Sequence, residues 1–246
     1  MKLSDRILEY MKEEAYSPML FQELADALNI EESKLDELEE TLEHMEAEGL
    51  IVKTRKKRYG LPERMNLIVG RLQGSKKGFG FLIPDNPNMK DIYIPVENLN
   101  GAMHNDKVIA RITKASIDTM RSEGEIIRIL KRANEKVVGT FENCKKYGFV
   151  VPDDQRIYQD IFVSREDFGG AKNGYKVVVE ITQWPEGRRN PEGRVIEILG
   201  HKNDVGTDIL SIIRGHNLPE EFPQEVEAQA NKIPDEISED IIKNRR

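Results

Sequence analysis

The chain has 246 residues, enough for one or two ordinary domains or several small ones. Hydrophobic residues make up 38% of it and charged residues 33%, so several small cores are expected rather than one large core. The net charge of −7 argues against a nucleic-acid binder as a whole, because such proteins usually carry a basic surface. How the charge is distributed along the chain is therefore more informative than the total.

Composition also excludes several classes of protein. No stretch reaches the roughly 18 consecutive apolar residues of a membrane helix, and the N-terminus shows no apolar signal segment. Cys144 is the single cysteine, so an intramolecular disulfide cannot form, and one cysteine with four scattered histidines excludes a Cys/His zinc site. We expect a cytoplasmic chain with no membrane partner and no cofactor of its own.

Residues 1–66, with a net charge of −6, are expected to form a winged helix. Apolar residues recur at helical spacing in three stretches, and Gly49 is placed to end the third. Two short β-branched or aromatic runs follow, around the basic tip Arg55, Lys56, Lys57 and Arg58. The third stretch is strongly acidic and would be repelled by DNA phosphates. We interpret this segment as an auxiliary RNA clamp or as a contact for a protein or ribosomal partner.

Residues 67–134 and 135–200 form an internal repeat. The sequence GFLIPD at 80–85 matches GFVVPD at 148–153, and DIYI at 91–94 matches DIFV at 160–163. Each unit consists of short β-branched and aromatic runs separated by Gly, Pro, Asn and Asp. The repeat therefore predicts a small all-β barrel used twice, with a net charge of +4 in the first copy and −1 in the second.

The first repeat carries the strongest signal for binding. In the stretch 76–82, treated as one strand, Phe79 and Phe81 point to the same face while Gly78 and Gly80 leave the other face bare. Exposed rings on a sheet stack on unpaired bases, and Tyr93 on a neighbouring run would add a third ring. Lys76 and Lys77 would meet the phosphates. The alternative is that the aromatics belong to the core and the lysines form a solvated edge.

The second repeat offers a weaker version of the same site. Its candidate residues for RNA binding are Lys145, Lys146, Tyr147, Phe149 and Phe162. Trp184 lies in a predicted loop with Arg188 and Arg189 nearby. We expect Trp184 to cover the end of the barrel, with stacking on a base as the second hypothesis.

The KGFGFL and DIYIP sequences of the first repeat resemble the paired RNA-binding motifs of cold-shock domains, which are OB-fold barrels. The expected fold is therefore multi-domain α+β: an N-terminal winged helix, two tandem five-stranded OB-fold barrels, and a connector at residues 201–246. The connector has a net charge of −4. Its carboxylates at 235, 236, 239 and 240 are interpreted as a solvated helix face rather than a metal site.

The whole arrangement resembles the N-terminal part of the ribonuclease R family, and the connector sequence DVGTDILSIIRGHNLPEEFP at 204–223 is the most specific part of the match. The resemblance implies single-stranded RNA as the partner, and a processive hydrolytic 3′→5′ exoribonuclease as the parent. It also implies Mg²⁺ held by aspartates of a catalytic domain beyond residue 246, so this chain alone is expected to be inactive. The alternative is a stand-alone nucleic-acid-binding regulator or RNA chaperone.

Overall fold

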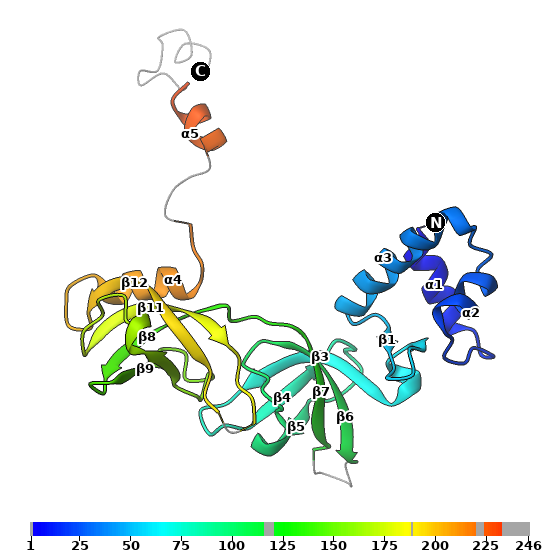
Figure 1. Ribbon diagram of the computed structural model, residues 1–246, viewed down its shortest axis with the longest axis horizontal. Coiled ribbons are helices and arrows are strands. Elements are labelled where there is room, and N and C mark those ends of the chain that lie inside the picture. Colours follow the sequence, from blue (N-terminus) through cyan, green and yellow to red (C-terminus); the bar gives the residue numbers. More distant parts are fainter. Residues whose placement is uncertain (1, 116–120, 188, 220–223, 233–246) are drawn as a thin grey trace, which may run out of the picture.

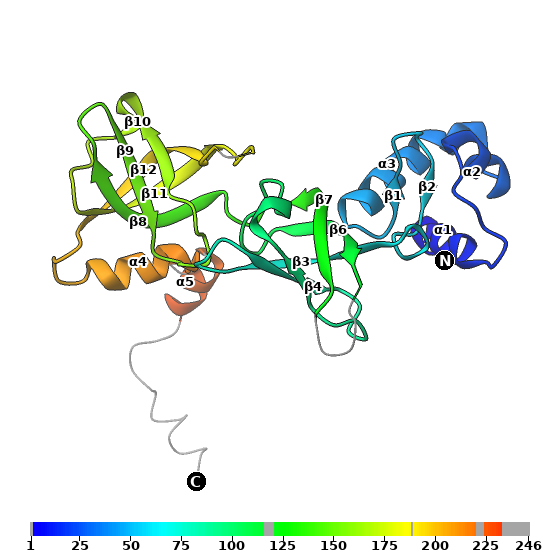
Figure 2. The ribbon, with the colours of Figure 1, turned by 90° about the horizontal axis from the view of Figure 1, so that it is seen from below.

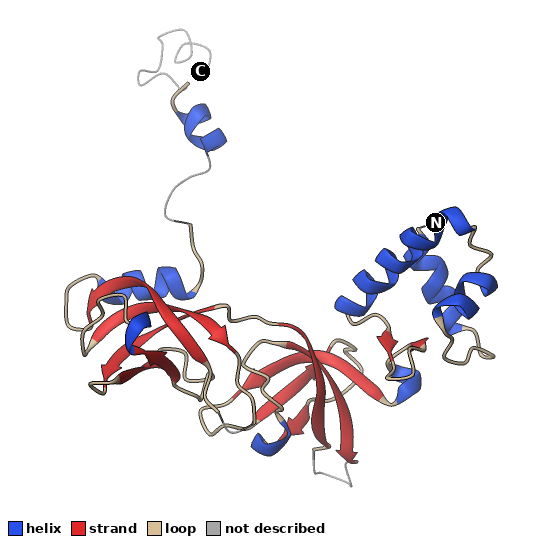
Figure 3. Ribbon diagram, viewed as in Figure 1, coloured by secondary structure: helices blue, strands red, loops and turns tan. Residues whose placement is uncertain are grey.

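The computed structural model describes residues 2–115, 121–187, 189–219 and 224–232. Three bodies lie in a row: a helical domain at one end, a first barrel in the middle and a second barrel at the other end (Figures 1 and 2). Figure 3 shows that the longer helices belong to the N-terminal domain and to the segment after the second barrel. No helix in these ranges is long and apolar enough to cross a membrane.

The N-terminal domain is a winged helix, as predicted. Its helices are α1 (Leu3–Lys12), α2 (Phe21–Ala27) and α3 (Leu35–Ala47), with a short 3₁₀ turn, Glu32–Lys34, before α3. Strands β1 (Val52–Lys53) and β2 (Tyr59–Gly60) form the wing, and Met19 adds a bridge to Tyr59. The helices bury one shared apolar core, which includes Ile7, Leu24, Leu38 and Leu42.

A glycine of the winged helix lies against the first barrel. Gly49 follows α3 with a φ of +73°, a conformation that side chains disfavour. A Cβ at this position would also lie 2.7 Å from Leu130 Cδ1 and 2.8 Å from Val69 Cγ1 of the barrel. Glycine is therefore required both by the turn that ends the helix and by the close approach of the two domains.

The two barrels have the same five-stranded topology. The first consists of β3 (Leu67–Gly74), β4 (Gly80–Pro84), β5 (Ile92–Ile94), β6 (Lys107–Lys114) and β7 (Glu123–Lys131), closed in the order β3-β4-β5-β7-β6. The second consists of β8 (Lys136–Asn143), β9 (Tyr147–Pro152), β10 (Ile161–Ser164), β11 (Tyr175–Gln183) and β12 (Glu192–His201). In each, the third and fifth strands pair in parallel and the other pairs are antiparallel. The prediction of two tandem OB-fold barrels is confirmed.

Short 3₁₀ turns complete the barrels: Glu63–Met65 precedes β3, Val96–Asn98 follows β5, and Arg165–Asp167 follows β10. Alternate residues of each strand point inward. Leu72, Leu82 and Ile94 are buried in the first barrel, and Phe141 and Val150 occupy the second. The other residues of each strand point out of the barrel, toward solvent or toward the neighbouring helices.

The barrels meet through a polar and aromatic junction. The Arg132 guanidinium lies 4.4 Å from the centre of the Trp184 ring, and it donates to the Gly101 carbonyl and to the buried Asp106 carboxylate. The remaining Asp106 oxygen accepts from the Ala133 amide. Trp184 also packs against the core of the second barrel. These contacts fix the short connection between β7 and β8.

The segment after the second barrel returns to pack on it. Helix α4 (Thr207–Gly215) buries Thr207 and Ser211 against the barrel, and Arg214 donates three hydrogen bonds of 2.8–3.0 Å to the Glu197 carboxylate of β12. Helix α5 (Gln224–Ala230) lies away from both barrels (Figure 1). The carboxylates at 235–240 lie outside the described residues.

Candidate nucleic-acid interface

Three aromatic rings gather on the outer face of the first barrel. The ring centres of Phe79, Phe81 and Tyr93 lie 5.5–5.9 Å from one another. Phe81 and Tyr93 are directly opposite on β4 and β5, and Phe79 comes just before β4. All three side chains are half-buried. We call this group the first ring trio; it presents apolar ring surface to solvent outside the core, as a stacking platform requires.

Phe81 faces outward because its neighbours on β4, Gly80 and Leu82, point into the core. Leu82 is fully buried, and a Cβ at Gly80 would lie 2.7 Å from Leu72 Cδ1. The bare strand face expected for Gly78 and Gly80 is therefore wrong in detail. Gly80 backs onto the core, whereas Gly78 lies in the turn before β4 with a φ of +89°. The turn takes Gly78 out of the strand and leaves Phe79 beside Phe81.

Cations border the first ring trio. Lys76 and Lys77 are exposed in the turn between β3 and β4, where Ser75 accepts from the amides of Lys77 and Gly78. The Arg121 guanidinium lies 4.7 Å from the centre of the Phe81 ring, a cation–π distance. Sequence reasoning missed Arg121, because nothing in its local sequence links it to a strand some forty residues earlier.

The second barrel carries an equivalent group, the second ring trio. The ring centres of Tyr147, Phe149 and Phe162 lie 5.6–5.9 Å apart, and Phe149 is directly opposite Phe162 on β9 and β10. Tyr147 is 42% exposed. Lys145 and Lys146 are exposed in the turn before β9. All six predicted ring residues thus form two matching groups, each next to its predicted lysine pair.

The two trios differ in the charges that flank them. Across the first sheet, Gln73 and Glu123 lie on either side of the Phe81–Tyr93 pair, and Glu123 is held by Lys114 at 2.7 Å. Across the second sheet, the Phe149–Phe162 pair lies between Glu142 and Glu192. Burial raises the pKa of the nearby Asp160, and the charge of Glu142 raises it further. The second trio is therefore in a more acidic setting, which is less favourable to phosphate.

The auxiliary residues predicted from sequence are more scattered. Trp184 lies at the barrel junction under Arg132, Arg189 is exposed in the loop that follows it, and Arg188 lies outside the described residues. In the wing, Arg58 donates to Glu23 and to the Pro18 carbonyl, so it serves the winged helix itself. Arg55, Lys56 and Lys57 are exposed at the tip. The structure brings none of the described residues of this set into either trio.

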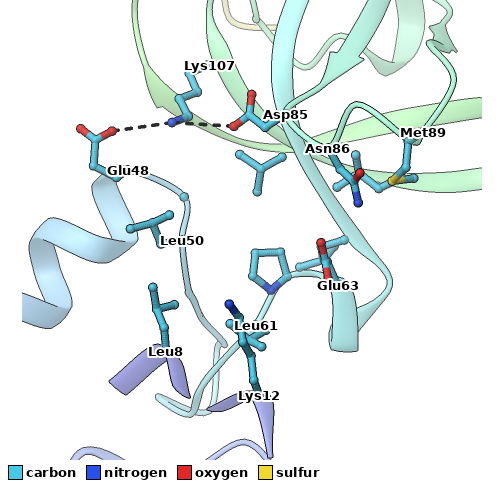
Figure 4. A pocket seen from close by; sticks show the side chains of 15 residues that line it. Leu8, Lys12, Glu48, Leu50, Leu61, Glu63, Asp85, Asn86, Met89 and Lys107 are labelled. Carbon is cyan, nitrogen blue, oxygen red and sulfur yellow. Dashed lines mark ion pairs between the residues drawn. The ribbon is translucent and has the colours of Figure 1, made fainter. Parts of the chain in front are cut away.

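Two glutamates at the C-terminal end of the acidic helix α3, or just after it, form ion pairs with the first barrel. Arg128 of β7 pairs with Glu46 and donates to the Lys53 carbonyl, while Lys107 lies between Glu48 and Asp85. Figure 4 shows the cavity beside Lys107 and its two acids, with Leu50 from the helical domain on one side and Met89 of the barrel on the other. The C-terminal end of α3 is thus neutralised by the basic first barrel.

Within the described ranges, no set of three or more His, Cys, Asp or Glu side chains could hold a metal ion. The Mg²⁺ that the resemblance implies finds no such set here, so no chemical step is assigned to it.

Comparison with known proteins agrees with this geometry. Residues 70–129 match the model of the ribonuclease B OB domain, and residues 149–223 match that of the cold shock domain. Ribonuclease R of Thermotoga maritima is 36% identical over 94% of this chain, and that of Escherichia coli strain K12 is 35% identical over 97% of it. The chain is related to the N-terminal region of ribonuclease R. It spans about 30% of the length of these two ribonuclease R relatives.

A solved ribonuclease R has the same fold over much of the chain. The Mycoplasma genitalium ribonuclease R in complex with ribose-methylated single-stranded RNA superimposes with a TM-score of 0.60 at 22% identity. The match covers 69% of this chain and 27% of that protein. The likeness is one of fold, over about two thirds of this chain.

Proposed function

We propose that this chain binds single-stranded RNA on its two ring trios, as the substrate-binding part of a 3′→5′ exoribonuclease of the ribonuclease R type. The observation that carries the proposal is the first ring trio, with three half-buried rings at mutual distances of 5.5–5.9 Å on an outer sheet face. Rings in that position stack on bases of any sequence, at about 1–3 kcal/mol per base. Exposed lysines and Arg121 beside them attract the phosphates.

Three further observations support the proposal. The same constellation occurs in both barrels, so one strand of RNA has two equivalent platforms. The relatives that match nearly the whole chain are ribonucleases R, and the M. genitalium relative was solved with single-stranded RNA. In a chain that also carries a catalytic domain with Mg²⁺, the barrels would hold the RNA while its 3′ end reaches the active site.

Two substitutions in the first ring trio test the proposal. Phe81→Ala and Phe81→Leu both remove the aromatic face, and each should weaken RNA binding by about 1–3 kcal/mol, measured by fluorescence anisotropy. The leucine variant keeps apolar volume, so its melting temperature should stay near that of the native chain. The matched control is Leu82→Ala, which opens a cavity in the core and costs about 2–5 kcal/mol of folding stability. Normal RNA affinity in both Phe81 variants, with earlier melting, would show that the ring is structural.

The second test places the barrels in an active enzyme. Deleting residues 67–200 from a ribonuclease R that contains this segment should raise KM for single-stranded RNA, because substrate capture is lost. An unchanged KM and product pattern would contradict the guidance role.

A further inference from the structure

Three cations form a row across the first barrel. Arg71 of β3 lies directly opposite Lys107 of β6, and Lys107 lies directly opposite Lys131 of β7. Residues directly opposite in an antiparallel pair present their side chains on the same face, and like charges so placed destabilise the sheet. We call these residues the basic row. Its repulsion is relieved when an anion lies across it.

The cations of the row are weakly engaged within the protein. Arg71 and Lys131 are exposed, and neither forms an ion pair with any residue that the structure describes. Lys107 Nζ lies 3.7 Å from Glu48 Oε2 and 3.8 Å from Asp85 Oδ2 (Figure 4). Both distances exceed that of a hydrogen bond, so Lys107 is shared between two acids and bound closely to neither.

The second barrel provides an internal comparison. The positions that correspond to the basic row by strand register are Thr140, Lys176 and Gly200. There the central lysine is held by Asp153 at 2.5 Å. Asp153 corresponds to Asp85 of the first barrel in the repeat. The two flanking cations are therefore particular to the first barrel. The lysine–aspartate pair occurs in both barrels, but in the first its two charged groups are farther apart, at 3.8 Å.

The basic row begins beside the first ring trio. Gln73 lies directly opposite Phe81, and Arg71 is two residues earlier on the same outward face of β3. From Arg71 the row continues across β6 to β7, which are neighbours in the closed sheet. A strand of RNA with bases on the rings thus has a row of cations within reach for its backbone.

We propose that Arg71, Lys107 and Lys131 bind successive phosphates of the RNA strand whose bases stack on the first ring trio. The inference rests on the proposed function and adds to it a phosphate site outside the cold-shock-like motifs. Without RNA, Glu48 and Asp85 share Lys107. When RNA binds, the phosphate takes their place at Nζ, and the row loses its repulsion.

Salt dependence separates this site from the rings. We would measure affinity for a labelled oligouridine of about 16 nucleotides, the upper site size of an OB fold, over a range of salt. Arg71→Thr, which installs the residue of the second barrel, and Lys131→Gln should each reduce the slope of log K against log salt by about 0.7. Phe81→Ala should weaken binding with the slope unchanged. Lys172→Gln, an exposed lysine of the second barrel, is the matched control.

A variant with the opposite sign completes the test. Asp85→Asn removes an acid from Lys107, so it should tighten RNA binding and steepen the salt dependence, which a loss of folding could not produce. Native slopes in Arg71→Thr and Lys131→Gln would overturn the basic row while the ring variants still test the proposed function. If the native chain fails to bind the oligonucleotide, the proposed function fails and the row fails with it.

Discussion

Outward-facing aromatic side chains could be predicted from the sequence because a strand has a period of two. Phe81 and Tyr93 alternate with Leu82, Ile92 and Ile94, so one set had to be inside and the other outside. The internal repeat then predicted the same arrangement for Phe149 and Phe162. The alternation of the sequence puts Gly78 in the strand, because local sequence does not reveal where a turn with positive φ ends.

Arg121 and the basic row could not be predicted, since both depend on contacts between distant strands. Arg71, Lys107 and Lys131 lie far apart in the sequence and meet through strand register alone. Their proximity follows from closure of the barrel, which no local pattern encodes.

His104 gives a prediction at the residue scale. It is 3% exposed, its Nδ1 accepts from the Gly74 amide, and its Nε2 has no hydrogen-bond partner among the described residues. Burial lowers the pKa of His104, and the Arg156 guanidinium lowers it further, although Asp154 acts in the opposite direction. The folded chain therefore keeps this histidine neutral at pH values where the unfolded chain protonates it.

The free energy of unfolding should consequently fall as the pH drops below about 6.5, the ordinary pKa of histidine, because the unfolded state then binds more protons. Urea unfolding at several pH values measures this slope. His104→Asn keeps an acceptor for Gly74 and should lose the acid sensitivity, whereas His44→Asn on exposed helix α3 should retain it. An identical pH dependence in His104→Asn and the native chain would contradict the account.

At the scale of elements, each barrel is a repeated unit with its own charge. The first unit has a net charge of +4 and the second −1. Part of this difference lies at the strand positions directly beside the ring trios. Glu142 of β8 occupies the position that Gln73 holds in β3. The helix that packs on the second barrel, α4, was expected only as part of a connector. Its buried face is just Thr207 and Ser211, too small a signal to predict the docking.

This difference predicts that Glu142→Gln strengthens RNA binding by the second barrel. Removing an exposed carboxylate beside a phosphate path should gain about 0.2–1 kcal/mol of binding free energy at low salt, and the gain should shrink as salt screens the charge. Anisotropy titrations at two ionic strengths measure it. Glu225→Gln on α5 is the control, because that helix lies away from both barrels. Unchanged or weaker binding by Glu142→Gln would mean that the second trio does not meet RNA.

At the scale of the whole molecule, the net charge of −7 is distributed unevenly among the domains. The helical domain has a net charge of −6, but two of its glutamates form ion pairs with Arg128 and Lys107 of the basic barrel. The more basic of the two barrels is the middle body of the three, next to the acidic helical domain (Figure 2). Such a distribution favours a strand that lies across the barrels and disfavours a broad polyanion such as a rigid duplex.

The most direct test of the account is the affinity of the intact chain for single-stranded RNA compared with a duplex of the same sequence at the same salt concentration. Stacking on the ring trios requires unpaired bases, so the single strand should bind more tightly, and unlabelled duplex should compete poorly for the bound strand. Equal or tighter binding of the duplex would contradict the account, because backbone charge would then suffice and the six rings would have no role in recognition.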